Sequence, residues 1–142
     1  MKEYIRKVAY HETDKMGITH HSNYIKWMEE ARVHYLEQIG CGYAKMEANG
    51  IVSPVIGVEC QYKNSTTFDD TVAVYVEIEE YKGVRLILSY KILNAENGQT
   101  VLTGKSMHCF VDSNGKPIML KKKFPNVDEK LRKHARADAE EK

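Results

Sequence analysis

A long amphipathic helix near the N-terminus is the feature that most limits how this chain can fold. Its apolar residues recur every three or four positions and so share one helix face; they are Tyr24, Trp27, Met28, Ala31, Tyr35, Leu36 and Ile39. Ser22 or Asn23 is suited to be the N-cap, and Gly40 stands where a C-terminal glycine cap belongs. The pattern predicts a helix of more than four turns at the centre of the fold.

Most of the remaining chain has β-strand character. Strand regions are predicted at residues 4–11, 51–62, 71–79, 84–93 and 100–111, and a short helix at 43–48. The pair Asn97-Gly98 predicts a hairpin turn. An antiparallel sheet must bury one face, and the long helix is the only large element available to cover it. We therefore predict an α+β fold, a curled antiparallel sheet wrapped around one long central helix.

Length and composition favour one ordinary domain with a polar end. The chain has 142 residues, of which 42% are hydrophobic. We expect a folded domain over residues 1–125 and a charged C-terminal tail over 126–142, helical between 127 and 136 and frayed at its end. No apolar run approaches the roughly 18 residues of a membrane span, and the N-terminus lacks the apolar core of a signal peptide.

The charge balance and the cysteines limit which binding partners, structural cross-links and cellular location we expect for this protein. Lys and Arg total 21 against 20 Asp and Glu, which gives no general attraction to nucleic acid or to an anionic membrane. The three cysteines, Cys41, Cys60 and Cys109, show no CxxC spacing. We expect neither a disulfide framework nor a structural zinc site, and a cytoplasmic location.

The turn before the long helix holds the most chemically suggestive group. Asp14 comes three residues before Gly17, and the helix begins just after His20 and His21. A carboxylate can act on an electrophile, and the free backbone N–H groups of a first helical turn can stabilise an oxyanion. The alternative for Asp14 is that it only shapes the turn before Gly17.

This segment resembles the 4-hydroxybenzoyl-CoA thioesterase family of hot-dog folds, including the short bacterial acyl-CoA thioesterases encoded beside Tol–Pal genes. The matching positions, in register, are Tyr10, Thr13, Asp14, Gly17, Ile18, Tyr24, Glu29, Ala31 and Arg32. The order of strands matches over residues 4–125. The chain departs from the family at Glu12, where Asp is frequent, and at Thr19, where an aliphatic residue is usual.

The resemblance implies an acyl-CoA thioesterase that releases a free acid and CoA. It makes Asp14 the catalytic carboxylate, as nucleophile or as general base for water, with Gly17 in the catalytic turn. It places an oxyanion-binding backbone N–H near His21, whose side chain either orients substrate or water or faces solvent. Glu29 is implied as an assisting acid or, as we prefer, a structural one. Tyr24 belongs to the core stripe and can also line the acyl pocket.

The residues that would hold the CoA phosphates are less well marked. Lys82 and Arg85 are candidates in the turn before a strand, and Lys63 is a weaker one; ordinary surface roles are the alternative. The histidines His11, His20 and His21 match neither an i, i+4 pair nor HExxH, so we expect no metal. The resemblance implies no cofactor besides the CoA of the substrate.

Two other functions stay open from the sequence. One is a hot-dog hydratase or dehydratase, although those relatives use a different histidine motif. The other is a non-catalytic acyl-CoA-binding module. The family also implies a homodimer or homotetramer with Asp14 facing a partner chain near residues 58–67, and acyl carrier protein as a second possible source of substrate.

Overall fold

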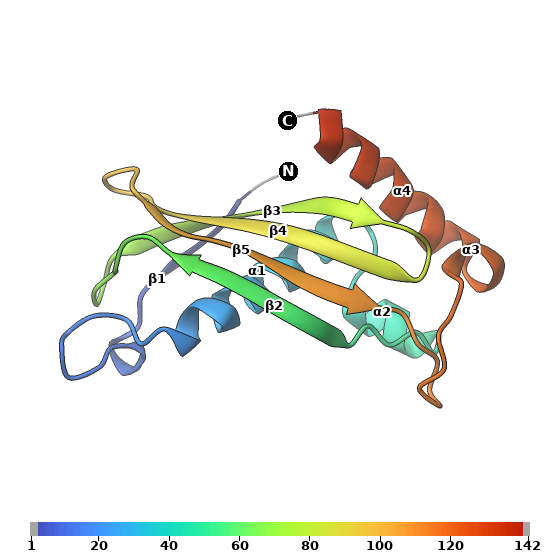
Figure 1. The fold of residues 1–142 in the computed structure, drawn as a ribbon, viewed down its shortest axis with the longest axis horizontal. Coiled ribbons are helices and arrows are strands. Elements are labelled where there is room, and N and C mark those ends of the chain that lie inside the picture. Colours follow the sequence, from blue (N-terminus) through green and yellow to red (C-terminus); the bar gives the residue numbers. More distant parts are fainter. Residues whose placement is uncertain (1–2, 141–142) are drawn as a thin grey trace. The chain divides into compact units, whose positions relative to one another are not determined.

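The computed structural model describes residues 3–140, and Figure 1 labels its helices and strands. The chain forms two compact units. The first unit comprises the chain up to Tyr35, with Cys60–Val76 and Tyr90–Gly104. The second comprises Leu36–Glu59, Glu77–Ser89 and the chain from Lys105 onward. The elements, in chain order, are β1 (Tyr4–Lys7), the 3-10 turn η1 (Tyr10–Glu12), α1 (Ser22–Gln38), α2 (Tyr43–Ala48), β2 (Val55–Tyr62), β3 (Thr71–Tyr81), β4 (Arg85–Asn94), β5 (Thr100–Cys109), α3 (Leu120–Lys123) and α4 (Pro125–Glu140).

The strands form one five-stranded sheet in the order β1-β3-β4-β5-β2. Strand β1 runs antiparallel to β3, with Tyr4 opposite Val74 and Lys7 opposite Thr71. Strands β4 and β5 are joined by the predicted hairpin, in which Gly98 has a φ of 75° and its N–H bonds to the Asn94 carbonyl at 2.8 Å. The predicted antiparallel sheet is therefore confirmed, and β1 and β2 are its edge strands.

Helix α1 has the predicted apolar stripe, and every member of the stripe is buried. In the first unit this face meets the sheet: Cys60 of β2 contacts the Met28 sulfur at 3.7 Å, and Arg32 bonds to the Tyr90 hydroxyl of β4 at 3.2 Å. The predicted glycine cap is also present. Gly40 has a φ of 82°, and the Cys41 N–H reaches back to the Leu36 carbonyl at 2.8 Å. This is a Schellman arrangement, which explains why the helix stops there.

Each unit has its own set of almost fully buried side chains. In the first unit they are Trp27, Met28, Val72, Ile92, Val101 and Leu102; in the second, Leu36, Ile51, Ile78, Leu86, Leu88, Phe110, Leu120 and Leu131. Most of these buried side chains are aliphatic, and most of those in strands occupy alternate positions, as expected for a sheet with one covered face.

The first strand is shorter than predicted. Residues 4–11 were expected to be extended, but β1 ends at Lys7 and the chain turns into η1. The Val8 N–H bonds to the Asp70 carbonyl at 2.9 Å, and the Ala9 N–H bonds to the Glu12 carboxylate at 2.8 Å. The Val8–Asp70 bond continues the register of β1 with β3, whereas the Ala9 N–H turns to the Glu12 side chain, so the pairing stops after Val8.

The C-terminal helix is longer than predicted at both ends. Pro125 opens α4, which fits the preference of proline for the first helical position. Frayed chain was expected after residue 136, but the helix continues to Glu140 because the Asp138 carboxylate accepts the Ile78 N–H of β3 at 2.8 Å. Residues 141 and 142 lie outside the described residues. The division into a domain of residues 1–125 and a tail stays a prediction.

A second contact holds α4 within its unit. The Tyr81 hydroxyl donates to Asp128 Oδ1 at 2.6 Å, and Arg132 Nε donates to Asp128 Oδ2 at 2.9 Å. Burial and the bond to Asp128 raise the pKa of Tyr81. Burial acts to raise the pKa of Asp128 too, but the bonds from Tyr81 and Arg132 prevail and lower it. The carboxylate is therefore kept ionised where the helix meets β3.

Candidate active site

Asp14 lies in a tight turn of the first unit. Thr13 and Thr19 pair as an isolated antiparallel bridge, so residues 13–19 fold back on themselves. The Asp14 N–H bonds to the Ile18 carbonyl at 2.9 Å, and the Gly17 N–H bonds to the Asp14 carbonyl at 2.9 Å. Gly17 has a φ of 78°, which L side chains rarely adopt. The half-buried Asp14 carboxylate accepts the Met16 N–H at 2.9 Å through Oδ1.

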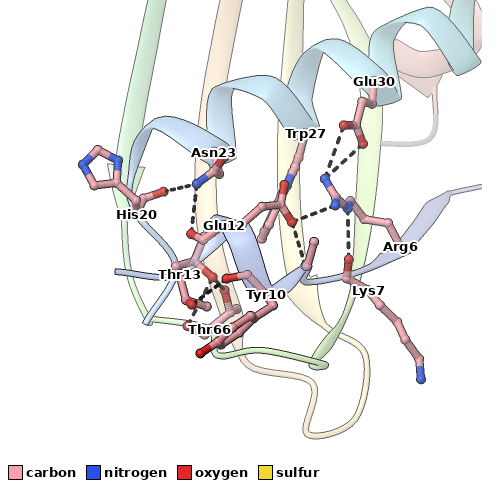
Figure 2. A network of polar contacts seen from close by, with 12 residues as sticks. Arg6, Lys7, Tyr10, Glu12, Thr13, His20, Asn23, Trp27, Glu30 and Thr66 are labelled. Atoms are coloured by element: carbon pink, nitrogen blue, oxygen red, sulfur yellow. Dashed lines mark hydrogen bonds and ion pairs between the residues drawn. The ribbon is translucent and has the colours of Figure 1, made fainter. Parts of the chain in front are cut away.

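A buried carboxylate, Glu12, holds this turn against α1 (Figure 2). Its Oε2 accepts the Trp27 indole N–H at 2.8 Å, and its Oε1 accepts an Arg6 N–H at 2.7 Å. Burial acts to raise the pKa of Glu12, but the hydrogen bonds from Trp27 and the Ala9 N–H, together with Arg6, prevail and lower it. Glu12 is therefore held ionised inside the first unit.

The start of α1 is fixed by Asn23. Its side-chain amide donates to the Glu12 carbonyl at 3.0 Å and to the His20 carbonyl at 3.3 Å, as Figure 2 shows. His20 Nδ1 lies 2.8 Å from the Ser22 hydroxyl, and the Ser22 N–H points to the same nitrogen at 3.3 Å. Glu12 and Asn23 thus connect the turn that contains Asp14 to the first turn of α1 by hydrogen bonds.

A cavity of about 250 Å³ opens beside this helix start, within the first unit. It is lined by Ile18, Thr19, His21, Tyr24, Tyr62, Lys63, Asn64 and Ser65. The Tyr62 ring lies 5.7 Å from the Tyr24 ring and 6.2 Å from the His21 ring, measured between centroids. The Tyr24 hydroxyl is 3.2 Å from the Thr66 hydroxyl. Three of the eight lining residues, His21, Tyr24 and Tyr62, therefore form an aromatic part of the wall, and Lys63 supplies a cation.

Several predicted site residues come together here. His21, Tyr24 and Lys63 all line the cavity. Asp14 and Gly17 belong to the adjoining turn, because the Asp14 N–H bonds to the carbonyl of the cavity residue Ile18. Tyr62 was not predicted as a site residue, since a tyrosine in a strand carries no local signal of a cavity. Glu12 was predicted only to differ from the Asp that is frequent in the family. In the structure its carboxylate accepts hydrogen bonds from Arg6, Ala9 and Trp27.

The other predicted residues lie elsewhere. Glu29 is exposed on α1, whereas its neighbour Glu30 accepts hydrogen bonds from Tyr4 at 2.9 Å and Arg6 at 3.2 Å. Lys82 and Arg85 are exposed in the second unit, and Lys82 pairs with Glu80 at 3.2 Å. The roles given to all these residues stay predictions.

Within residues 3–140, no helix is both long and apolar enough to cross a bilayer. Over the same residues, no three His, Cys, Asp or Glu side chains come together as metal ligands would.

The sheet, the long helix and the turn before it define a hot-dog protein of the thioesterase type. The sequence profile of the thioesterase-like superfamily matches residues 8–134, and the chain belongs to that family. The predicted family, fold class and hydrolase class are thus confirmed.

Individual relatives agree with this assignment. A putative acyl-CoA thioesterase, YneP of Bacillus subtilis, is 37% identical over 121 residues, which are 84% of this chain and 87% of the relative. The structure of a DHNA-CoA thioesterase from Staphylococcus aureus superposes with a TM-score of 0.92 at 35% identity, over 99% of this chain and 95% of that one. A gentisyl-coenzyme A thioesterase, BH1999, superposes with a TM-score of 0.78 at 26% identity, over 91% and 98%.

Proposed function

We propose that the protein hydrolyses acyl-CoA thioesters and prefers aromatic acyl groups. The observation that carries this proposal is the meeting of three parts in one unit: the Asp14 turn, the start of α1 and the aromatic-lined cavity. In the net reaction, one water is consumed, the carbon–sulfur bond breaks, the acyl group is released as the free acid, and the CoA sulfur leaves as a thiol with a proton.

Asp14 is the proposed catalytic carboxylate. The Met16 N–H donates to Oδ1 at 2.9 Å, which orients the side chain, and within residues 3–140 no hydrogen bond engages Oδ2. Asp14 either attacks the carbonyl carbon or takes a proton from the attacking water, and the same position serves both routes. A single turnover in H₂¹⁸O that gives product acid without ¹⁸O would show direct attack followed by hydrolysis of the anhydride at the Asp14 carboxyl carbon. Labelled product acid fits the general-base route and also hydrolysis of the anhydride at the acyl carbon.

The backbone N–H of His21 is the proposed oxyanion donor. It comes immediately before α1, and among residues 3–140 no acceptor bonds to it. The first N–H groups of a helix carry partial positive charge, so they favour a developing negative oxygen. The loss of one such donor typically slows acyl transfer by about 10²–10³-fold.

The aromatic wall supports the choice of acyl group. Tyr24, Tyr62 and His21 present rings to the cavity, and aromatic groups pack well against ring edges and faces. The DHNA-CoA and gentisyl-coenzyme A thioesterases among the relatives are named for aromatic acyl groups, which agrees with this preference.

A second copy of the chain is proposed to complete the site. Strand β2 is a sheet edge and exposes apolar side chains, with Val55 at 47%, Ile56 at 56% and Tyr62 at 49%. Exposed apolar edges are a liability that strand pairing removes. Pairing of two β2 strands would bring the partner's copy of the chain to the cavity that Tyr62 lines.

The test is release of free thiol from benzoyl-, hydroxybenzoyl-, octanoyl- and palmitoyl-CoA, and from an acyl carrier protein ester. We expect the aromatic esters to react fastest, and Asp14→Asn to lower kcat at least about 100-fold. Asp69→Asn is the matched control, because Asp69 is an exposed acid of the same unit whose φ of 69° suits asparagine.

Two results would contradict the proposal. Equal turnover by Asp14→Asn and the native protein would exclude Asp14 as the catalyst. Binding of CoA esters without hydrolysis of any of them would favour the non-catalytic module, and hydration of an enoyl-CoA would favour the hydratase.

A further inference from the structure

The side chain of Asn23 lies at the start of α1 but does not cap the helix. Asn23 is the second residue of α1 and is 8% exposed. A capping side chain accepts hydrogen bonds from the first N–H groups of its helix through an oxygen. The Asn23 oxygen accepts none within residues 3–140; its amide nitrogen instead donates to the carbonyls of Glu12 and His20, which precede the helix. The side chain therefore serves a purpose other than capping.

Each of these two carbonyls is held by two donors. The Glu12 carbonyl accepts the Asn23 side-chain amide at 3.0 Å and the His20 N–H at 2.8 Å. The His20 carbonyl accepts the same amide at 3.3 Å and the Asn23 backbone N–H at 3.0 Å. Figure 2 shows both side-chain bonds leaving one Asn23 nitrogen. A carbonyl oxygen has two lone pairs, so these four bonds engage both oxygens fully.

The bonds to the His20 carbonyl also set the direction of the His21 N–H. Both groups belong to the peptide that joins His20 to His21, and the C=O and N–H of a planar trans peptide point in opposite directions. Rotation of this peptide would break both bonds to the His20 carbonyl and turn the His21 N–H away. Asn23 therefore holds in place an N–H that no acceptor within residues 3–140 engages.

The bond to the Glu12 carbonyl ties the same peptide to the turn that contains Asp14. Asp14 follows Glu12 by two residues, and its own N–H bonds to the Ile18 carbonyl at 2.9 Å. One buried amide thus connects the proposed catalytic carboxylate to the proposed oxyanion donor. The relative placement of such groups matters, because an error of about 1 Å can slow a reaction about a hundredfold.

We propose that Asn23 is a positioning residue for thioester hydrolysis and acts through the His20–His21 peptide. It holds the His21 N–H in the direction that meets the oxygen of the thioester carbonyl, and it does not itself contact the substrate. Donors that are fixed before the substrate arrives need no reorganisation during the reaction. This inference rests on the function proposed above, which makes the His21 N–H the oxyanion donor.

The first test compares the kinetics of Asn23→Ala with those of the native protein. Alanine favours the helix but cannot donate to either carbonyl. We expect kcat to fall about 10- to 100-fold because a misplaced donor stabilises the oxyanion less. KM should stay within about threefold, as for a group that acts only in the transition state.

Ser22→Ala is the matched control at the same helix start. Ser22 is exposed, and its hydroxyl lies 2.8 Å from the His20 ring nitrogen Nδ1 rather than at the His20 carbonyl. We expect its kcat to stay within about twofold of the native value. Thermal unfolding of the three proteins gives an assay temperature at which all of them are folded.

A second measurement follows the His21 N–H directly and does not depend on turnover. Nitrogen-15 relaxation gives the order parameter of this N–H. We expect it to fall from ~0.85, the value of rigid backbone, toward ~0.6 in Asn23→Ala, and to stay unchanged in Ser22→Ala. The N–H of Ala31, a buried residue in the middle of α1, is the internal reference and should stay rigid in both variants.

Three outcomes would overturn the inference. Equal losses of kcat in the two variants would show that any weakening of the helix start slows the reaction. A higher KM at unchanged kcat would assign Asn23 to substrate binding. An unchanged order parameter of the His21 N–H in Asn23→Ala would show that other groups hold the peptide.

These results are distinct from a failure of the proposed function. If Asp14→Asn loses turnover and Asn23→Ala keeps it, the proposed function stands and this inference fails. If the native protein hydrolyses no thioester, the proposed function fails, whereas a loss of order at His21 in Asn23→Ala still supports the role of Asn23 in holding the peptide.

Discussion

At the scale of single residues, Glu12 shows how a buried charge can organise a catalytic turn. Its carboxylate is bonded to Arg6 of β1, to the Ala9 N–H and to Trp27 of α1. A buried carboxylate is costly unless it is paired and hydrogen-bonded. These three partners meet that requirement, and in doing so they hold three parts of the chain in one place.

The free energy of unfolding should depend on pH through the ionisation of the Glu12 carboxylate. Because the pKa of Glu12 is lowered in the fold, its contribution is complete above the unfolded value near 4.5 and is lost as pH falls through the folded value. We expect the free energy of unfolding to decrease below about pH 4.5. Glu12→Gln should remove that part of the slope and cost about 1.5–3 kcal/mol at neutral pH. Urea unfolding from pH 3 to pH 7 measures both effects.

The exposed acid Glu29 on α1 provides the control for that measurement. Glu29→Gln should leave the unfolding free energy within about 0.5 kcal/mol at neutral pH. If the pH profiles of Glu12→Gln and the native protein run parallel below pH 4.5, the network does not stabilise the ionised form.

The residues of the site differ in how far the sequence reveals them. Asp14 and His21 stand out because an acid before a helix start is a local pattern, and Tyr24 because it repeats within the helical stripe. Tyr62 reaches the cavity only through the path of β2, which no local pattern encodes. Glu12 was missed for a similar reason, since Arg6 and Trp27 meet it only after the fold forms.

At the scale of helices and strands, too, the features with a local sequence pattern were predicted, and those that depend on contacts made in the fold were not. The C-terminal end of α1 and the six residues of α2 follow from local signals, an apolar period and a glycine with positive φ. The expected N-cap was wrong, because α1 begins at Ser22 and both Ser22 and Asn23 lie within the helix.

The length of α4 depends instead on a partner distant in sequence, because the Asp138 carboxylate accepts the N–H of Ile78. The end of β1 depends on the Glu12 side chain, which accepts the Ala9 N–H and is itself held by Arg6 and Trp27.

Helix α4 completes a sheet edge in its unit. Strand β1 pairs with β3 only from Thr71 to Val74, so the later residues of β3 have no strand on that side. The Asp138 carboxylate accepts the Ile78 N–H at 2.8 Å, and Asp138 is 3% exposed. An acidic side chain thus takes the place of the missing strand's carbonyl.

Removal of that carboxylate should loosen α4. Asp138→Ala leaves the buried Ile78 N–H without this acceptor, and we expect a loss of about 1–3 kcal/mol in the free energy of unfolding. Hydrogen exchange should speed up at Ile78 and through α4. The control is Glu129→Ala, which changes an exposed acid of the same helix. Unchanged exchange at Ile78 in Asp138→Ala would show that the helix does not depend on this bond.

At the scale of the whole molecule, the exposed edge strand β2 is the reason why we expect two copies of the chain to associate. Ile56 of β2 is 56% exposed and Val58 is 39% exposed, although both are strongly apolar. A sheet that ends in such a strand can pair with a second copy and form one continuous sheet. In such a pair the partner's β2 would lie beside Tyr62, which lines the cavity together with His21.

A charged side chain on β2 should therefore dissociate the paired chains, and thioester hydrolysis should slow as they dissociate. We expect Ile56→Lys to halve the mass measured by light scattering, because a lysine on an edge strand opposes strand pairing. Thioester turnover should fall with it at protein concentrations where the native assembly persists. Ile5→Lys is the matched control, since Ile5 is 57% exposed and lies on β1, the other edge strand. A monomeric Ile56→Lys protein with full turnover would show that one chain holds the complete site.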